Sequence, residues 1–289
     1  SPTLFPTHSS WDFLISSLVE PSYFHMFDEV MKWIKEKRVK REMIAEEIPI
    51  KDTGSWYTDK KTGNIYHESG KFFSIVGMKA FSKHREVKGW CQPILKQPEV
   101  GILGIITKKF GGVLHFLMQG KDEPGNIDGV QISPTLQATK SNYTRVHKGA
   151  LPLFFDYFED LDTFDGAHTL PFRAGKQAPL SINPEPLDFA RDGLKGGEPA
   201  EPQTPAFRPG CVERVDSDKR KVLYKKLQSE EGGRFLQKHN LNVVIEIGED
   251  EDISCPDNFM WMTLYQLKRL MEFEDIVNSC TRSIIACLP

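Results

Sequence analysis

The chain has 289 residues, a hydrophobic content of 39% and a formal net charge of −3, which together describe a globular protein that can bury a sizeable core. The near-neutral charge argues against a general nucleic-acid surface, and no apolar run approaches the length of a membrane span. The five cysteines include no C-x-x-C pair, and SPTLFPTHSSWDF lacks the features of a signal peptide. We therefore expect reduced thiols in a cytoplasmic protein, without a disulfide framework or a zinc site.

Residues 1–47 are predicted to form an N-terminal helical segment. A helix is expected over Ser22–Arg41, because Phe24, Phe27, Met31 and Ile34 recur at helical spacing. The basic end of this helix, KEKRVKR, suits the negative end of the helix dipole and needs no ligand to explain it.

From Ile48 to His147 the pattern changes to short β segments divided by turns. DKKTGNIYH and HESGKFFSIVG are typical of consecutive hairpin elements. VGILGIITKKFGGVLHFLMQGK predicts a hairpin that turns between Lys108 and Gly112. The next stretch, QISPTLQAT, alternates apolar with uncharged polar residues and predicts one strand over residues 131–139.

The polar face of that strand is unusual because it carries no charge before Lys140. Neighbouring stretches repeat the pattern, so adjacent strands would build a polar wall. Its predicted members are Gln131, Ser133, Thr135, Gln137, Thr139, His115, Gln119, Lys121, Glu123, Asn142, Tyr143 and Arg145. The wall either lines a pocket for a hydroxyl-rich ligand, with Arg145 or Lys121 on a phosphate, or it is an ordinary solvated sheet face.

Residues 160–216 hold 8 of the 19 prolines and show no period, so we predict a Pro/Gly-rich insertion there. The insertion interrupts one α+β domain made of residues 48–159 and 217–289. In the second part, KVLYKKLQSEEGGRFLQKHN is helix-like and NVVIEI is a strand. TLYQLKRLMEF is a helix opened by a capping box of Thr263 and Gln266, and IVNSCTRSIIACL is a last packed helix or strand.

Six stretches together resemble one enzyme family. They are GSWYTDKKTGNIYHESGKFFSIVG, GWCQPILKQPEVGILGI, GGVLHFLMQGKDEPGN, QISPTLQATKSNYTRVH, LQSEEGGRFL and RSIIACLP. In this order they are similar to the NDP-hexose 2,3-dehydratases of deoxysugar biosynthesis. The resemblance implies a Nudix-hydrolase-like mixed β-sheet flanked by helices. It also implies a lyase that removes water from a nucleotide sugar of the dTDP-4-keto-6-deoxyglucose type.

Family members typically carry two such repeats, and this chain has one. We therefore expect a homodimer that rebuilds the two-lobed arrangement. A Nudix-like fold also raises the alternative of metal-dependent pyrophosphate hydrolysis. That chemistry needs several carboxylates on one helix, whereas LQSEEGGRFLQ offers Glu230 and Glu231 without the rest of the signature. No metal and no cofactor are expected.

Eliminating water across C2 and C3 requires a base at C3, an acid at O2 and donors for the enolate oxygen at O4. The candidate bases are His115, Glu123 and Glu68, and the candidate donors are Tyr143 and Lys121. Binding candidates are Trp56, His67, Gln119, Asn126, Gln131, Thr135, Gln137, Thr139, Asn142, Arg145, Arg234 and Trp261. A non-catalytic nucleotide-sugar-binding module, or a half-enzyme that supports another chain, is the alternative, and a structural interaction domain is a third reading.

Overall fold

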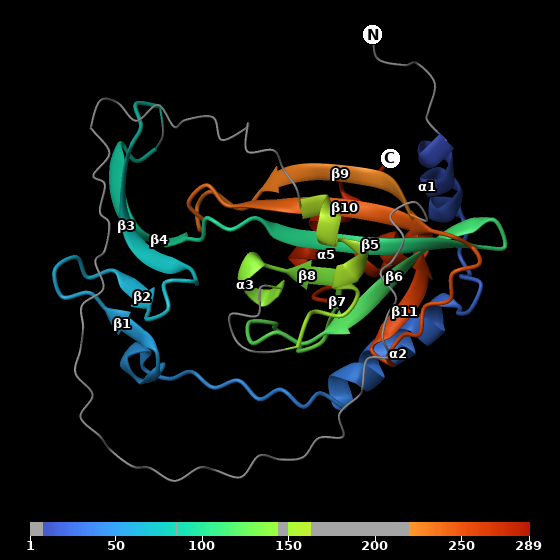
Figure 1. The fold of residues 1–289 in the computed structure, drawn as a ribbon, viewed down its shortest axis with the longest axis horizontal. Coiled ribbons are helices and arrows are strands. Elements are labelled where there is room, and N and C mark those ends of the chain that lie inside the picture. The colour runs from blue at the N-terminus through green and yellow to red at the C-terminus, as the bar shows by residue number, and fades with distance from the viewer. Residues whose placement is uncertain (1–7, 85, 144–149, 163–219) are drawn as a thin grey trace. The chain divides into compact units, whose positions relative to one another are not determined.

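A computed structural model describes residues 8–84, 86–143, 150–162 and 220–289, and it contains two β-sheets and five α-helices within those ranges (Figure 1). The helices are α1 (His8–Leu18), α2 (Phe27–Val39), α3 (Lys140–Tyr143), α4 (Leu264–Leu270) and α5 (Ser279–Ile285), with 3-10 turns η1 (Ile50–Asp52), η2 (Phe155–Tyr157) and η3 (Glu159–Asp162). The strands are β1 (Trp56–Thr58), β2 (Ile65–His67), β3 (Ser74–Phe81), β4 (Gly89–Lys96), β5 (Gly101–Phe110), β6 (Val113–Lys121), β7 (Gln131–Ser133), β8 (Leu136–Ala138), β9 (Arg220–Ser229), β10 (His239–Ile247) and β11 (Phe259–Thr263).

The larger sheet is mixed and has the order β11-β6-β5-β10-β9, with β7 paired to β6 and β8 paired to β5. Only β5 and β10 pair in parallel, and the other strand pairs of both sheets in the described residues are antiparallel. The predicted α+β class is therefore confirmed. The smaller sheet, β1-β2-β3-β4, is a meander that contains the two predicted hairpin elements.

The larger sheet is buried on both faces. Helices α1, α2, α4 and α5 cover one face with residues such as Phe13, Ile34, Leu267 and Ile284. The segment around Phe158 covers the other face and packs on the inner residues of β5, β8 and β10. Since both faces are buried, alternation along a strand here separates two cores rather than a core from water.

The β5–β6 hairpin confirms the prediction for residues 100–121, with a tighter turn than expected. Its two linking residues, Gly111 and Gly112, have φ of 57° and 79°. Two consecutive positive φ angles give the turn a twist that matches the twist of the flanking strands, and glycine adopts them without strain.

The prediction of one strand over residues 131–139 is wrong. The chain breaks at Pro134–Thr135 into β7, which pairs with β6, and β8, which pairs with β5. As a result Ile132 packs in the core under the helices, while Leu136 and Ala138 pack in the opposite core. Pro134 cannot donate a ladder hydrogen bond, which favours a break at this point.

The predicted helix over residues 221–240 is also wrong, because β9 runs from Arg220 to Ser229 and pairs with β10 along its whole length. Tertiary pairing overrides the helix propensity of its Lys and Gln residues. The strand prediction for β10 is confirmed, and the helix predicted over Ser22–Arg41 is present as the shorter α2. Helix α1 lies within the predicted N-terminal helical segment, but no separate helix was predicted at its position.

Near the C-terminus the predicted capping box is present. The Thr263 hydroxyl accepts the Gln266 N–H at 3.2 Å, and the Gln266 side chain accepts the Thr263 N–H at 3.1 Å. The last apolar stretch contains helix α5, one of the two predicted alternatives. Apart from residues 160–162, the predicted insertion lies outside the described residues. No helix in the described parts of the chain is long and apolar enough to cross a membrane.

Candidate functional site

Strand β5 changes its pairing partner along its length, and several of the predicted polar residues lie where the two partners, β6 and β8, diverge. We call this place the fork. The first half of β5 pairs with β8 at Ile102–Gly104, and its second half pairs with β6 at Thr107–Phe110. Thr135 lies where the two pairings separate. Its hydroxyl donates to the Leu117 carbonyl at 2.5 Å and accepts the Ile106 N–H at 3.0 Å. Thr135 is only 2% exposed, so both of its hydrogen bonds hold the fork together.

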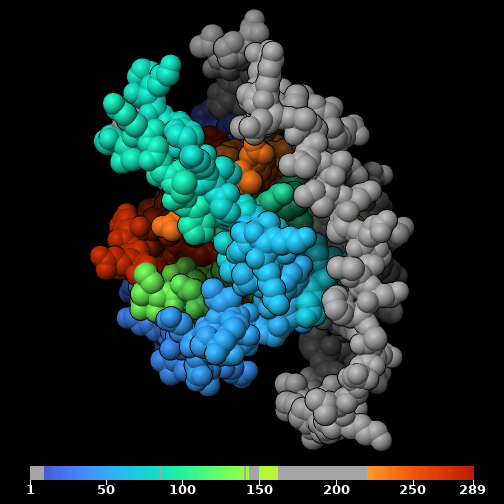
Figure 2. Space-filling model, turned by 90° about the vertical axis from the view of Figure 1, so that its left-hand side faces the viewer, coloured from blue at the N-terminus to red at the C-terminus, as the bar shows by residue number. Residues whose placement is uncertain are grey.

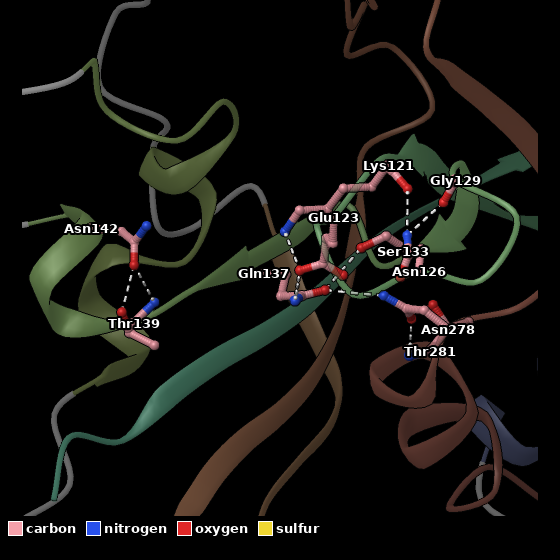
Figure 3. Close-up of polar contacts among 10 residues, drawn as sticks. All are labelled: Lys121, Glu123, Asn126, Gly129, Ser133, Gln137, Thr139, Asn142, Asn278 and Thr281. Carbon is pink, nitrogen blue, oxygen red and sulfur yellow. Dashed lines mark hydrogen bonds and ion pairs between the residues drawn. The ribbon is translucent and has the colours of Figure 1, made fainter. Parts of the chain in front are cut away.

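A carboxylate and an ammonium group lie side by side at the mouth of this fork (Figure 3). Lys121 Nζ is 3.6 Å from Glu123 Oε1, and the side chains are 26% and 33% exposed. The same carboxylate oxygen accepts a hydrogen bond from Gln137 Nε2 at 2.9 Å. Both contacts fall on Oε1, so Oε2 has no partner within the described ranges.

The Gln137 amide is itself held in one orientation. Its Oε1 accepts hydrogen bonds from Ser133 Oγ and from Asn278 Nδ2, each at 3.1 Å. Asn278 is the N-cap of α5, where its Oδ1 accepts the Thr281 N–H at 2.8 Å. With the amide oxygen occupied twice, the amide nitrogen must point to Glu123. We call Lys121, Glu123, Ser133, Gln137 and Asn278 the Glu123 cluster.

His115, a candidate base, lies elsewhere. It is 1% exposed on β6, where Nε2 accepts the Tyr23 N–H at 2.8 Å and Nδ1 donates to the Val113 carbonyl, also at 2.8 Å. Phe110 and Phe24 pack edge-on against the ring. Burial lowers the pKa of His115, so the ring is neutral near pH 7. Both nitrogens are engaged with the backbone, and neither one faces the Glu123 cluster.

Other predicted residues lie near the cluster without joining it. Gln131 is opposite Lys121, and Gln119 is opposite Ser133, so these side chains share one face of β6 and β7. Asn126 holds the loop after β6 by donating to the Gly129 carbonyl at 2.6 Å.

Thr139 and Asn142 bond to each other at 2.5 Å and lie apart from the cluster (Figure 3). Trp261, on β11, is half-buried against Phe110 at a ring distance of 5.2 Å. Arg145 and the side chain of Tyr143 lie outside the described residues.

The smaller sheet holds three of the predicted residues. The rings of Trp56 and His67 are 5.2 Å apart, and Phe73 packs on Trp56 at 4.7 Å. Glu68 follows β2 and is exposed. The aromatic contacts serve the core of a small sheet, and the cluster contains none of these residues.

A groove of about 640 Å³ lies between β3–β4 and the turn that contains Gly233 and Arg234. Figure 2 shows the teal surface of β3 and β4 toward the viewer. Leu95 joins the two parts, since its N–H donates to the Arg234 carbonyl at 2.9 Å and its carbonyl accepts the Leu236 N–H at 2.8 Å. Gln92 adds a bond to the Gly233 carbonyl at 2.7 Å. The Arg234 side chain is 76% exposed, which leaves its guanidinium accessible to a ligand.

Asn278 and Ser133 are the members of the cluster that sequence reasoning did not single out as ligand-binding residues. Asn278 precedes Ser279–Ile285, and an Asn before an apolar helix is an N-cap signal, yet nothing local predicts its contact with a residue 141 positions away. In the described parts of the chain, no group of three or more His, Cys, Asp or Glu side chains is arranged to hold a metal ion.

Comparison with known proteins gives concordant results. A family model described as NDP-hexose 2,3-dehydratase matches residues 27–167 and 202–288. A dTDP-4-dehydro-6-deoxy-alpha-D-glucopyranose 2,3-dehydratase of Amycolatopsis orientalis is 34% identical over 268 residues, which are 91% of this chain and 44% of the relative. Proteins with the same name from Saccharopolyspora spinosa and Streptomyces violaceoruber are 32% and 33% identical, and each match covers 89% of this chain and 41% or 45% of the relative. The chain therefore spans less than half the length of these curated relatives.

Proposed function

The chain belongs to the NDP-hexose 2,3-dehydratase family, and on that premise we propose that it is a lyase that eliminates water from an NDP-4-keto-6-deoxyhexose. The names of the relatives support a dTDP-linked substrate and a role in deoxysugar biosynthesis. The observation that carries the proposal is the Glu123 cluster, in which a carboxylate and an ammonium group lie 3.6 Å apart at an accessible position.

The elimination requires an acid and a base that act on adjacent carbons. The C4 ketone of the substrate acidifies the C3 proton, and Glu123 Oε2 accepts that proton to leave an enolate. The enolate electrons form the C2–C3 double bond and expel the C2 hydroxyl, which leaves as water with a proton from Lys121. The resulting enol tautomerises to the 3,4-diketone. Gln137 keeps the carboxylate in place while Oε2 reacts.

Glu123 is a better base than the two other candidates for geometric reasons. His115 is buried, and its Nε2 lone pair already accepts a backbone N–H. Glu68 is exposed on the smaller sheet, with no described ammonium or amide contact to orient it. Glu123 combines an oriented side chain, a free oxygen and a proton donor beside it.

We place the nucleotide in the groove beside Arg234. Its floor contains Ile75, Ile94 and Leu95, which suit a pyrimidine face, and Arg234 suits the diphosphate. The residues from Arg234 back to Glu230 run from this groove toward α5. A nucleotide sugar that lies along them, with its nucleotide in the groove, would therefore bring its hexose toward the Glu123 cluster.

We also propose that two copies pair and that the larger sheet is Nudix-hydrolase-like. The mixed sheet with helices on one face supports the second assignment. For pairing, α1 presents an apolar stripe of Trp11, Leu14, Ile15 and Leu18, which are between 42% and 71% exposed at i, i+3, i+4 and i+7. Sedimentation tests it: Leu14→Glu should convert a dimer to a monomer, and an already monomeric wild type would contradict pairing.

The function is tested by incubating the full chain with dTDP-4-keto-6-deoxyglucose and recording product masses. Loss of the mass of one water, abolished in Glu123→Gln, is the expected result. The half-length match to the relatives favours a second candidate, a nucleotide-sugar-binding module without activity. Tight binding of the substrate with no loss of water would support that candidate and overturn the lyase proposal.

A further inference from the structure

A second, smaller cavity lies between α5 and the strands β9 and β10. Its volume is about 50 Å³, which is enough for a few non-hydrogen atoms and too small for a whole hexose. We call it the Asn242 cavity. The lining residues that matter here are Leu103, Glu230, Asn240, Asn242, Cys280 and Ser283.

Asn242 lines this cavity with an unpaired acceptor. The residue is 0% exposed, and its Nδ2 donates to Ser283 Oγ at 3.3 Å. Its Oδ1 is buried and accepts no hydrogen bond from any residue that the structure describes. Ser283 cannot satisfy that oxygen in its present geometry, because its hydroxyl donates to the Cys280 carbonyl at 2.8 Å. A buried carbonyl without a donor destabilises a fold, so this arrangement favours a ligand that donates a hydrogen bond.

The other polar groups of the cavity restrict which ligand fits. Glu230 contributes a carboxylate, and Asn240 Nδ2 donates to its Oε1. A phosphate is excluded by a carboxylate and a free carbonyl oxygen, which both repel negative charge. A neutral hydroxyl matches the cavity because its proton can be donated to the unpaired Asn242 Oδ1 or to the Glu230 carboxylate.

The cavity adjoins the Glu123 cluster. Leu103 is the register partner of Gln137 on one side and of Asn242 on the other, so all three side chains project from the same face of the sheet. Cys280 lies between the two sites. Burial and then the charges of Glu230 and Glu123 raise the pKa of its thiol to about 11.

We propose that the Asn242 cavity is a subsite that binds one hydroxyl group of the hexose of a nucleotide sugar. This inference rests on the proposed function for the identity of the ligand. It adds a sugar-recognition element, formed by Asn242 and Glu230, which is separate from the acid and base at Lys121 and Glu123.

The test compares dTDP-glucose with dTDP in calorimetric binding to the full chain, using wild type and Asn242→Leu. Leucine has a similar size, and its introduction leaves the Ser283 hydroxyl bonded to the Cys280 carbonyl. We expect about 3- to 10-fold weaker binding of dTDP-glucose, the worth of one neutral hydrogen bond, and unchanged binding of dTDP. Because the variant removes an unpaired carbonyl, its Tm should also rise, by about 2 °C or more. An unchanged ratio of the two affinities would mean that the cavity holds water only, and would overturn the proposal.

A second measurement uses the wild type alone and covers the case in which the variant fails to fold. Alkylation at alkaline pH is followed by mass spectrometry at Cys280, with the exposed Cys91 as internal reference. dTDP-glucose should slow alkylation of Cys280 by about tenfold relative to Cys91 when it is saturating, while dTDP should not. Equal protection by both ligands, or by neither, overturns the subsite. If the chain still removes water from the keto sugar in that case, only the subsite proposal fails and the proposed function stands. If neither ligand binds and no water is lost, the subsite and the proposed function both fail.

Discussion

Replacing Glu123 by glutamine tests the proposed role of this residue as base separately from its contribution to folding. The introduced amide has the size of the carboxylate, and its oxygen can still accept the hydrogen bond from Gln137. The substitution removes the charge opposite Lys121, but that pair is 3.6 Å apart and its side chains are 26% and 33% exposed. Losing it should therefore lower the free energy of unfolding by at most about 1 kcal/mol.

The effect on turnover should be much larger. An amide cannot accept the C3 proton, and removing a general base typically costs about 100-fold or more, which is about 2.7 kcal/mol of activation free energy. Two assays measure this loss: release of water from dTDP-4-keto-6-deoxyglucose, and exchange of the C3 proton with deuterated solvent. Glu68→Gln is the matched control, because it makes the same chemical change at an exposed position on the smaller sheet.

The two assays together show whether Glu123 acts as the base, as the acid or as neither. Loss of both water release and proton exchange in Glu123→Gln, with a normal urea midpoint and a normal Glu68→Gln, is expected. Loss of water release with preserved exchange would move Glu123 to the acid step. A Glu123→Gln variant that retains at least a third of the wild-type rate would refute its role as base.

Three further substitutions test the surrounding assignments. His115→Ala should lower the free energy of unfolding by about 2–4 kcal/mol in urea, because the Tyr23 N–H loses its acceptor and a cavity forms, while the folded fraction keeps its turnover within a few-fold. Since burial lowers the pKa of His115 below 6.5, the stability it contributes is fully present above pH 6.5 and is lost as the pH falls through the folded pKa, so the same variant should flatten the acid limb of a stability–pH curve. Thr135→Val should lower the free energy of unfolding in urea by about 2–3 kcal/mol, because the Leu117 carbonyl and the Ile106 N–H lose their partner in the fork. A decrease of less than about 0.5 kcal/mol would contradict that role. Arg234→Ala should weaken dTDP binding by about tenfold and reduce its dependence on salt, and unchanged calorimetric binding would place the nucleotide elsewhere.

Local signals predicted the elements whose causes are local. The capping box at Thr263 and Gln266 involves residues three positions apart, and the β5–β6 hairpin depends on two adjacent glycines. Such features can be recognised because the interacting groups are close in sequence. The two errors have long-range causes. β9 is a strand because β10 pairs with it, and residues 131–139 divide because β7 and β8 have different partners.

The same distinction applies to the site. Alternation placed Lys121, Glu123 and Gln137 on one polar wall, and the family resemblance made Lys121 and Glu123 catalytic candidates; the three side chains do come together at the fork. Asn278 was missed because its contact with Gln137 spans 141 positions. His115 shares the parity of Lys121, and parity cannot show that a backbone N–H from another segment occupies its nitrogen.

Hydrogen-bond saturation separates structural from reactive polar groups in this fold. Thr135 and His115 are buried, and all their strong bonds go to the backbone, so they hold strands and loops together. Glu123 has one oxygen committed and one free, and Asn242 has its nitrogen committed and its oxygen free. A group that is oriented by one bond and left with an unused lone pair can accept a proton or a hydroxyl without first breaking a contact, which is the condition for a preorganised site. On this argument the uncharged strand residues that first suggested a pocket act mainly as scaffolding. Under the proposed function, the chemistry is assigned to the few side chains that the scaffold orients and leaves with an unused lone pair.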